Sequence, residues 1–260
     1  MIARLSLTVP AADIRYSIGF RMALLTLVRH GQASFLESNY DKLSERGERQ
    51  SRILGEYWLR TGATFDQVYY GPACRHLRTG EIVAEVYRRA GAAWPEPVTL
   101  PELDEYPGIE VMRAFLPGLM EKHEDIRALE AEFRQTGDRS AAFRVYDKLF
   151  QRITRMWVDQ ELDSPEVESW RNFCERVDRG IATIRDGAHK NGRVAVFTSG
   201  GVIAATVRQA LDLAPQRTLE LSWTSRNASY TEFLFSIERF SLSSFNNHPH
   251  LDDEELLTYR

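Results

Sequence analysis

Short apolar runs alternate along this chain with longer segments in which apolar residues recur every three or four positions. The short runs predict strands, which lie at residues 24–28, 66–70, 98–100 and 193–197. The periodic segments predict helices, which lie at residues 45–61, 75–90 and from about 200 to Leu211. Strands that alternate with helices are typical of a mainly parallel sheet. The sequence therefore predicts an α/β fold with three layers, α/β/α.

The last part of the chain predicts further strands near residues 218–223, 229–236 and 239–245, with the last pair antiparallel. Residues 106–163 are instead charged and helical, with almost no strand signals. They predict a helical insertion that lies over a site. The next helix carries an apolar stripe from Trp170 to Ile184, and Ser164 is its predicted N-cap. This stripe, and a similar one from Tyr146 to Trp157, is interpreted as core packing.

The chain divides into two parts of unequal size. Residues 1–21 have no continuous apolar core of the signal-peptide type and fit no element, so we expect a poorly ordered N-terminal appendage. Met22 directly precedes the first predicted strand. Residues 22–260 are long enough for a single α/β domain that includes the insertion.

Composition narrows the class of protein. A hydrophobic content of 43% is ordinary for a globular protein, and a net charge of −4 with scattered basic residues argues against a nucleic-acid partner. No apolar stretch reaches the roughly 18 residues of a membrane helix, so no membrane partner is expected. The two cysteines, Cys74 and Cys174, lie in unrelated contexts. A reduced, cytoplasmic location is therefore expected.

Polar residues follow each predicted parallel strand where that strand ends. Arg29-His30-Gly31 follows the first strand, and segments beginning at Gly71, Glu102 and Thr198 follow the others. Parallel strands bring their carboxyl ends to one edge of the sheet, where open α/β folds bind ligands. We therefore expect these segments to form one site.

The sequence of these segments resembles the histidine phosphatase superfamily, the phosphoglycerate mutase-like proteins, over about residues 22–245. The resemblance rests on three motifs: Arg29-His30-Gly31, Leu43-Ser44-x-x-Gly47-x-x-Gln50, and Gly71-Pro72-x-x-Arg75-x-x-x-Thr79. It implies that His30 is a nucleophile that becomes phosphohistidine. It also implies that Arg29 and Arg75 bind phosphate and that Glu105 is the proton donor.

The chemistry of these residue types agrees with those roles. An imidazole attacks phosphorus only when it is neutral, and two nearby guanidinium groups would lower its pKa. The same cations would bind the phosphoryl oxygens. Such a reaction requires no metal and no cofactor, and the sequence offers no cluster of metal ligands.

The chain departs from the family at one hallmark. Ser199 stands where the resemblance implies a second active-site histidine. A serine hydroxyl still donates a hydrogen bond, and the backbone of Ser199 and Gly200 opens a helix that can bind an anion. Gln32 is predicted either to contact phosphate or to cap the loop. The spare histidines are His76, His248 and His250, and for each a surface or structural role is favoured.

Several alternatives stay open at this point. Glu102 competes with Glu105 as proton donor, although the family spacing favours Glu105. The leading function is a metal-independent phosphomonoesterase acting on a phosphorylated small molecule or a phosphoprotein. Because of Ser199, the alternative is an impaired enzyme that serves as a phosphate-binding or scaffold protein. A mutase is a lesser variant, since the sequence Glu-Leu-Asp-Glu-Tyr at residues 102–106 departs from the Glu-Leu-Asn-Glu-Arg typical of such mutases. The sequence determines neither the substrate nor the oligomeric state.

Overall fold

A six-stranded sheet with the strand order β3-β2-β4-β1-β5-β6 forms the centre of the molecule. The computed structural model describes residues 22–34 and 41–259, so the predicted appendage at residues 1–21 lies outside the described residues. The strands are β1 (Ala23–Arg29), β2 (Gln67–Tyr70), β3 (Pro97–Thr99), β4 (Arg193–Thr198), β5 (Tyr230–Phe235) and β6 (Phe240–Asn247). Strands β1 to β4 pair in parallel, whereas β5 and β6 are antiparallel to their neighbours.

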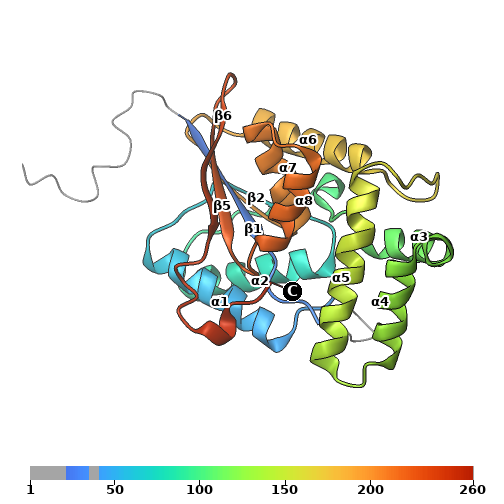
Figure 1. The fold of residues 1–260 in the computed structure, drawn as a ribbon. Helices are drawn as coiled ribbons and strands as arrows, with labels where there is room; N and C mark the ends of the chain where they lie inside the picture. Colours follow the sequence, from blue (N-terminus) through green and yellow to red (C-terminus); the bar gives the residue numbers. More distant parts are fainter. Residues whose placement is uncertain (1–21, 35–40, 260) are drawn as a thin grey trace, which may run out of the picture.

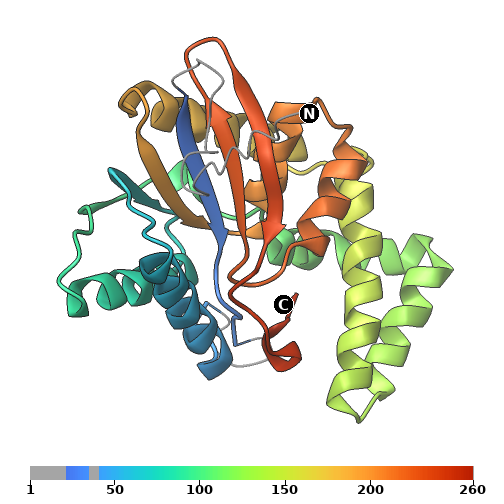
Figure 2. The same ribbon diagram turned by 90° about the vertical axis from the view of Figure 1, so that its left-hand side faces the viewer.

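Helices cover both faces of this sheet (Figures 1 and 2). The helices are α1 (Glu45–Arg60), α2 (Cys74–Arg89), α3 (Gly108–Lys122), α4 (Glu124–Gln135), α5 (Arg139–Val158), α6 (Trp170–Gly187), α7 (Gly200–Leu211) and α8 (Pro215–Thr224), with short 3-10 helices at Pro101–Leu103 and Glu254–Leu256. The predicted three-layer α/β/α class is therefore confirmed.

Alternate residues of β4 pack against different helices, which shows what covers each face of the sheet. Val194 and Val196 are fully buried in a core cluster with residues of α6 and α7. Ala195 and Phe197 are buried in a second cluster with residues of α1 and α2. Because successive strand residues point to opposite faces, a continuous apolar run produces a sheet that is covered on both sides.

Helices α3, α4 and α5 occupy the segment where the helical insertion is predicted. They lie beside the sheet near the carboxyl ends of its parallel strands (Figure 1). Helix α5 packs against α3, α4 and α8. Its buried residues Leu149, Ile153 and Trp157 belong to the same core cluster as α6 and α7. These three residues confirm the expected core packing of the stripe, whereas Tyr146 and Phe150 are only partly buried against the core.

Two predicted elements are wrong. Residues 218–223 form part of helix α8 rather than a strand. Their apolar alternation matches a strand, but Pro215 at the first helical position favours a helix, and Leu219 and Ser222 face the core one turn apart. The helix after the insertion begins at Trp170, not at Pro165. The carbonyl of Ser164 accepts a hydrogen bond from the backbone N–H of Val167, which closes a single turn that does not continue as a helix. The hydroxyl of Ser169 instead accepts the backbone N–H of Asn172 at 3.2 Å and caps α6.

Within the described ranges, each helix is too short or too polar to cross a membrane.

Candidate active site

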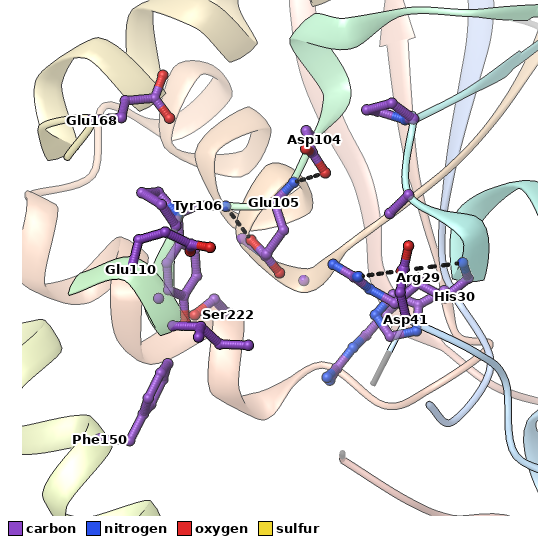
Figure 3. A pocket seen from close by; sticks show the side chains of 18 of the residues that line it. Arg29, His30, Asp41, Asp104, Glu105, Tyr106, Glu110, Phe150, Glu168 and Ser222 are labelled. Carbon is purple, nitrogen blue, oxygen red and sulfur yellow. Dashed lines mark hydrogen bonds and ion pairs between the residues drawn. The ribbon is translucent and has the colours of Figure 1, made fainter. Parts of the chain in front are cut away.

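The predicted site segments meet at the carboxyl edge of the parallel strands. A cavity of about 690 Å³ opens there, and Arg29, His30, Arg75, Glu105 and Gly200 all line it. In Figure 3, Glu105 lies between a group formed by Arg29, His30 and Asp41 and a second group that includes Tyr106 and Glu110. Residues from four different strand ends thus share one cavity, as their positions in the sequence predict.

His30 is held as a neutral imidazole with a defined tautomer. It follows the last residue of β1, and its backbone N–H donates to the carbonyl of Thr198 at 2.8 Å. Its Nδ1 lies 2.7 Å from the carbonyl oxygen of Gly31, which assigns the proton to Nδ1 and leaves a lone pair on Nε2. Burial lowers the pKa of His30 well below its usual value, and Arg75 and Arg29 add to this effect.

Two close approaches shape the loop that carries His30. A Cβ on Gly31 would lie 2.3 Å from the carbonyl oxygen of Gly47, and a Cβ on Gly47 would lie 2.1 Å from the carbonyl of Gln32. Neither position therefore tolerates a side chain without movement. Gln32 itself acts in the loop: its backbone N–H donates to Gln50, and its side-chain oxygen accepts the hydroxyl of Ser44 at 3.0 Å. Of its two predicted roles, the structure shows the loop contacts.

Arg29 ends β1 and is 8% exposed. Its guanidinium donates to the carbonyl of Ser225 and, at 2.6 Å, to the carbonyl of Tyr259. Both acceptors come from the last part of the chain, which also closes on the start of α1 through a bond of 2.7 Å from Gln50 to the carbonyl of Leu256. The C-terminal segment therefore fixes the guanidinium at the edge of the cavity.

Arg75 lies in the first turn of α2 and pairs with an acid that sequence reasoning missed. Its guanidinium lies 2.6 Å from Oδ1 of Asp41, and the two side chains are 11% and 36% exposed. The other oxygen of Asp41 accepts the backbone N–H of Cys74 at 2.8 Å and so caps α2. A carboxylate thus stands beside the cation that is predicted to bind phosphate.

Glu105 faces the cavity, whereas Glu102 is not among the residues that line it. One oxygen of Glu105 accepts the backbone N–H of Tyr106 at 3.0 Å, and the other accepts that of Gly201 at 3.3 Å. Burial raises the pKa of Glu105, while these two N–H groups and the nearby arginines partly oppose the shift. A carboxyl group that keeps its proton more readily than usual suits a proton donor.

Ser199 and Gly200 open α7 directly after β4. Gly200 lines the cavity, and a Cβ there would lie 2.8 Å from the carbonyl of Ser222 and 3.5 Å from Nε of Arg29. Ser199 is fully buried, and its Oγ lies 2.5 Å from Nε2 of His76. The ring of His76 is also fully buried, and its centroid is 5.6 Å from that of His30. Of the surface and structural roles predicted for His76, its burial excludes the surface role.

The other spare histidines lie outside the cavity lining. His250 is 5% exposed and packs against the rings of Tyr57 and Tyr230. His248 contacts the guanidinium of Arg226. Neither position brings an imidazole to His30, which agrees with the surface or structural role favoured for both.

The remaining wall of the cavity comes largely from the helical insertion and α8. It includes the aromatic rings of Tyr106, Tyr146, Phe150 and Trp223. It also includes the carboxylates of Asp104, Glu110 and Glu168, of which Glu168 pairs with Arg176 at 2.8 Å. Arg176 also lines the cavity, so the part beyond Arg29 and Arg75 is aromatic and carries more carboxylates than arginines. Among the described residues, no group of three or more His, Cys, Asp or Glu is placed to hold a metal ion.

Comparisons with known proteins agree with the fold. The model of the histidine phosphatase superfamily (branch 1) matches residues 25–248. Bacillus stearothermophilus YhfR has a TM-score of 0.60 and 18% identity, with 88% of this chain and 100% of that chain covered. Phosphoserine phosphatase from Entamoeba histolytica, in complex with 3-phosphoglyceric acid, has a TM-score of 0.58 and 17% identity, with 88% and 100% covered. Phosphoglycerate mutase from Bacillus anthracis has a TM-score of 0.58 and 16% identity, with 89% and 96% covered. No curated protein sequence matches this chain.

Proposed function

Because the chain belongs to the histidine phosphatase superfamily, we propose that it is a metal-independent phosphomonoesterase that works through a phosphohistidine on His30. The observation that carries the proposal is the state of His30. The lowered pKa of His30 keeps its ring neutral, the carbonyl of Gly31 accepts its Nδ1 proton, and the residue lines a cavity that two arginines also line. A pure binding site for phosphate has no need of a neutral imidazole at this position.

In the first step, Nε2 of His30 attacks phosphorus. The P–N bond forms as the P–O bond to the alcohol breaks, and Glu105 gives its proton to the leaving oxygen. Arg29 and Arg75 stabilise the negative charge that is spread over the three remaining phosphoryl oxygens. For Arg75, this requires that phosphate compete with the carboxylate of Asp41.

In the second step, water replaces the alcohol. The ionised carboxylate of Glu105 takes a proton from the water as its oxygen attacks phosphorus, and the P–N bond breaks. The products are inorganic phosphate and neutral His30, and Glu105 regains its proton. The elevated pKa of Glu105 favours its return to the acid form.

The proposed substrate is a phosphorylated small molecule or a phosphoprotein whose alcohol carries no second anion. The aromatic rings suit an apolar or aromatic leaving group. Asp104 and Glu110 repel a second negative group near the phosphate. A phosphoglycerate, which carries a carboxylate, fits this wall poorly, and for this reason a mutase is the weaker candidate.

The alternative function is a phosphate-binding or scaffold protein with little turnover. Two features favour it: Ser199 stands where the resemblance implies a second active-site histidine, and Arg75 already pairs with Asp41. This protein would bind a phosphorylated ligand in the same cavity without transferring the phosphoryl group.

Hydrolysis of p-nitrophenyl phosphate by wild type and by His30→Gln separates the two functions. The enzyme is expected to hydrolyse the ester and to carry an acid-labile, alkali-stable phosphoryl group, and both properties should vanish in His30→Gln. The variant His250→Gln, which replaces a buried imidazole outside the cavity, is the matched control. Tight phosphate binding without turnover of a broad substrate panel would establish the binding protein instead.

A further inference from the structure

Glu105, the proposed proton donor, lies in a segment that forms neither helix nor strand. Residues 104–107 follow a short 3-10 helix and precede α3. From this segment the side chain of Glu105 extends into the space between Tyr106 and His30 (Figure 3). A carboxyl group on such a segment keeps its position only if other side chains fix the backbone that carries it.

Arg176 of α6 binds this backbone. Its Nη1 donates at 3.0 Å to the carbonyls of both Glu102 and Asp104, and its Nη2 donates to the carbonyl of Glu105 at 3.4 Å. Nε and the second N–H of Nη2 donate to the two carboxylate oxygens of Glu168, at 2.9 and 2.8 Å. A guanidinium has five N–H groups, and here each of them has an acceptor. Although Arg176 lines the cavity, its donors are therefore all used by the protein itself.

The surrounding elements complete this hold on the segment. The carbonyl of Leu103 accepts the hydroxyl of Thr198 at 2.7 Å. Each carbonyl of residues 102–105 thus accepts a hydrogen bond from a side chain of α6 or β4. Gly180, one turn further along α6, allows the helix to lie this close, because a Cβ there would lie 2.8 Å from Cβ of Glu102. Side chains therefore do for this segment what backbone hydrogen bonds do for a strand.

We propose that Arg176 is the positioning residue of the proton donor: it binds the backbone of residues 102–105 and thereby holds the Glu105 carboxyl at the leaving oxygen of the substrate. This inference rests on the proposed function. Arg176 contacts neither the leaving oxygen nor the phosphoryl group, and it makes or breaks no bond in the reaction. Glu168 keeps the guanidinium in place from its other side.

A displaced proton donor affects different esters unequally. p-Nitrophenolate is a good leaving group that departs without a proton, whereas the alkoxide of 2-phenylethanol departs only as it is protonated. Loss of Arg176 should therefore slow the alkyl ester selectively. Partial unfolding or a damaged phosphate site would instead lower both rates by the same factor.

The kcat/KM values of p-nitrophenyl phosphate and 2-phenylethyl phosphate test the proposal. This parameter covers the steps up to transfer of the phosphoryl group to His30, in which Glu105 acts as the acid. Arg176→Met keeps an apolar stem against the ring of Phe173. It should lower kcat/KM about tenfold or more for the alkyl ester and less than about threefold for the nitrophenyl ester. The double variant Arg176→Met, Glu168→Gln, in which no unpaired carboxylate is left behind, should show the same selective loss.

Two further variants complete the comparison. Arg208→Met removes a second ion pair of α6, that with Asp178 at 2.6 Å, which is 25% and 34% exposed against 18% and 27% for Arg176 and Glu168. Arg208 does not line the cavity, so this variant should change neither rate. Glu105→Gln lacks the proton donor. In that background, adding Arg176→Met should slow the alkyl ester no more than the nitrophenyl ester, because the two residues act as a unit.

Three results would overturn the proposal. They are equal or absent losses for the two esters in Arg176→Met, a selective loss that vanishes in the double variant with Glu168→Gln, and a selective loss that persists in the Glu105→Gln background.

Failure of the proposed function gives a different result, in which wild type hydrolyses neither ester. Amide hydrogen exchange over residues 103–106 then tests the hold on this segment without turnover, since all four N–H groups donate to acceptors within residues 100–106. Exchange about tenfold faster in the double variant with Glu168→Gln, but not in Arg208→Met, would support the hold by Arg176. Unchanged exchange, or the same change in Arg208→Met, would refute it.

Discussion

The carboxylate of Asp41 competes with phosphate for the guanidinium of Arg75. It pairs with Arg75 at 2.6 Å and accepts the backbone N–H of Cys74 at 2.8 Å. The substitution Asp41→Asn removes its negative charge but keeps a side-chain oxygen that can cap α2. We predict that Asp41→Asn binds inorganic phosphate more tightly than wild type.

The size of the effect follows from the charges. A phosphate dianion on Arg75 would lie about 6 Å from the Asp41 carboxylate, and the repulsion is about 1.5–3 kcal/mol at effective dielectric constants of about 80 to 40. The side chain of Asp41 is 36% exposed, so solvent screening favours the lower value. A repulsion of about 1.4 kcal/mol corresponds to about tenfold in affinity. Loss of this partly exposed ion pair should lower the free energy of unfolding by less than about 1 kcal/mol.

The inhibition constant of inorganic phosphate, measured as a competitive inhibitor, checks the prediction. Isothermal titration calorimetry with inorganic phosphate measures the same dissociation constant without a substrate. Asp125→Asn is the matched control, because Asp125 pairs with Arg152 at 3.1 Å on the exposed surface of the insertion. Unchanged or weaker phosphate binding in Asp41→Asn would refute the reasoning and would show that Asp41 holds Arg75 in its binding position.

Three further predictions follow from the site. Burial and nearby arginines lower the pKa values of His30 and His76, and burial lowers that of His250 to about 4. The unfolded chain therefore binds protons that the folded chain does not, and the free energy of unfolding should fall as pH decreases from about 7 towards 4, by up to about 1.4 kcal/mol per pH unit for each histidine. Glu105, whose raised pKa has the opposite sign, should offset only part of this loss near its own pKa. Urea unfolding at several pH values checks the slope, and a flat profile would contradict neutral burial. Phenyl phosphate should be hydrolysed several-fold faster than 4-carboxyphenyl phosphate in kcat/KM, because the acidic wall repels the added carboxylate; the opposite preference would contradict this. Finally, Ser199→His alone should unfold at a temperature several degrees lower, since overpacking against His76 costs about 1–3 kcal/mol. Ser199→His combined with His76→Ala should restore the unfolding temperature, as followed by circular dichroism, and a fully stable single variant would be the contrary result.

Much of the fold and the site can be predicted from local features of the sequence. Apolar runs define the parallel strands, and the residues that follow them must gather at one edge. Arg29, His30, Arg75 and Glu105 line one cavity for this reason. The prediction needs no knowledge of packing, because strand direction alone brings the four segments together.

Helix α8 shows where local patterns fail. The alternation of Leu219, Leu221 and Trp223 fits a strand as well as it fits part of a helix. Pro215 and the packing of α8 against α7 and α5 decide in favour of the helix. Tertiary contacts of this kind are not visible in a window of ten residues.

The contacts of His76 and Asp41 could not be predicted for a related reason. Helical spacing places His76 about 100° around α2 from Arg75, but whether that direction is surface or core depends on the neighbouring strand ends. The space that Gly71 leaves for the ring appears only in three dimensions. Asp41 lies in a loop with no periodic pattern, so nothing in the sequence pairs it with a residue 34 positions away.

The two carbonyl groups that hold Arg29 have a consequence for how the protein acquires its activity. They lie 196 and 230 residues further along the chain, so the cation is anchored only after both of these distant segments have been made and folded. Contacts of such long sequence separation form late and at high entropic cost. During gradual denaturation, the proposed activity should therefore disappear while most helices are still intact, and during synthesis it should emerge only after the segment that contains Tyr259 has been made.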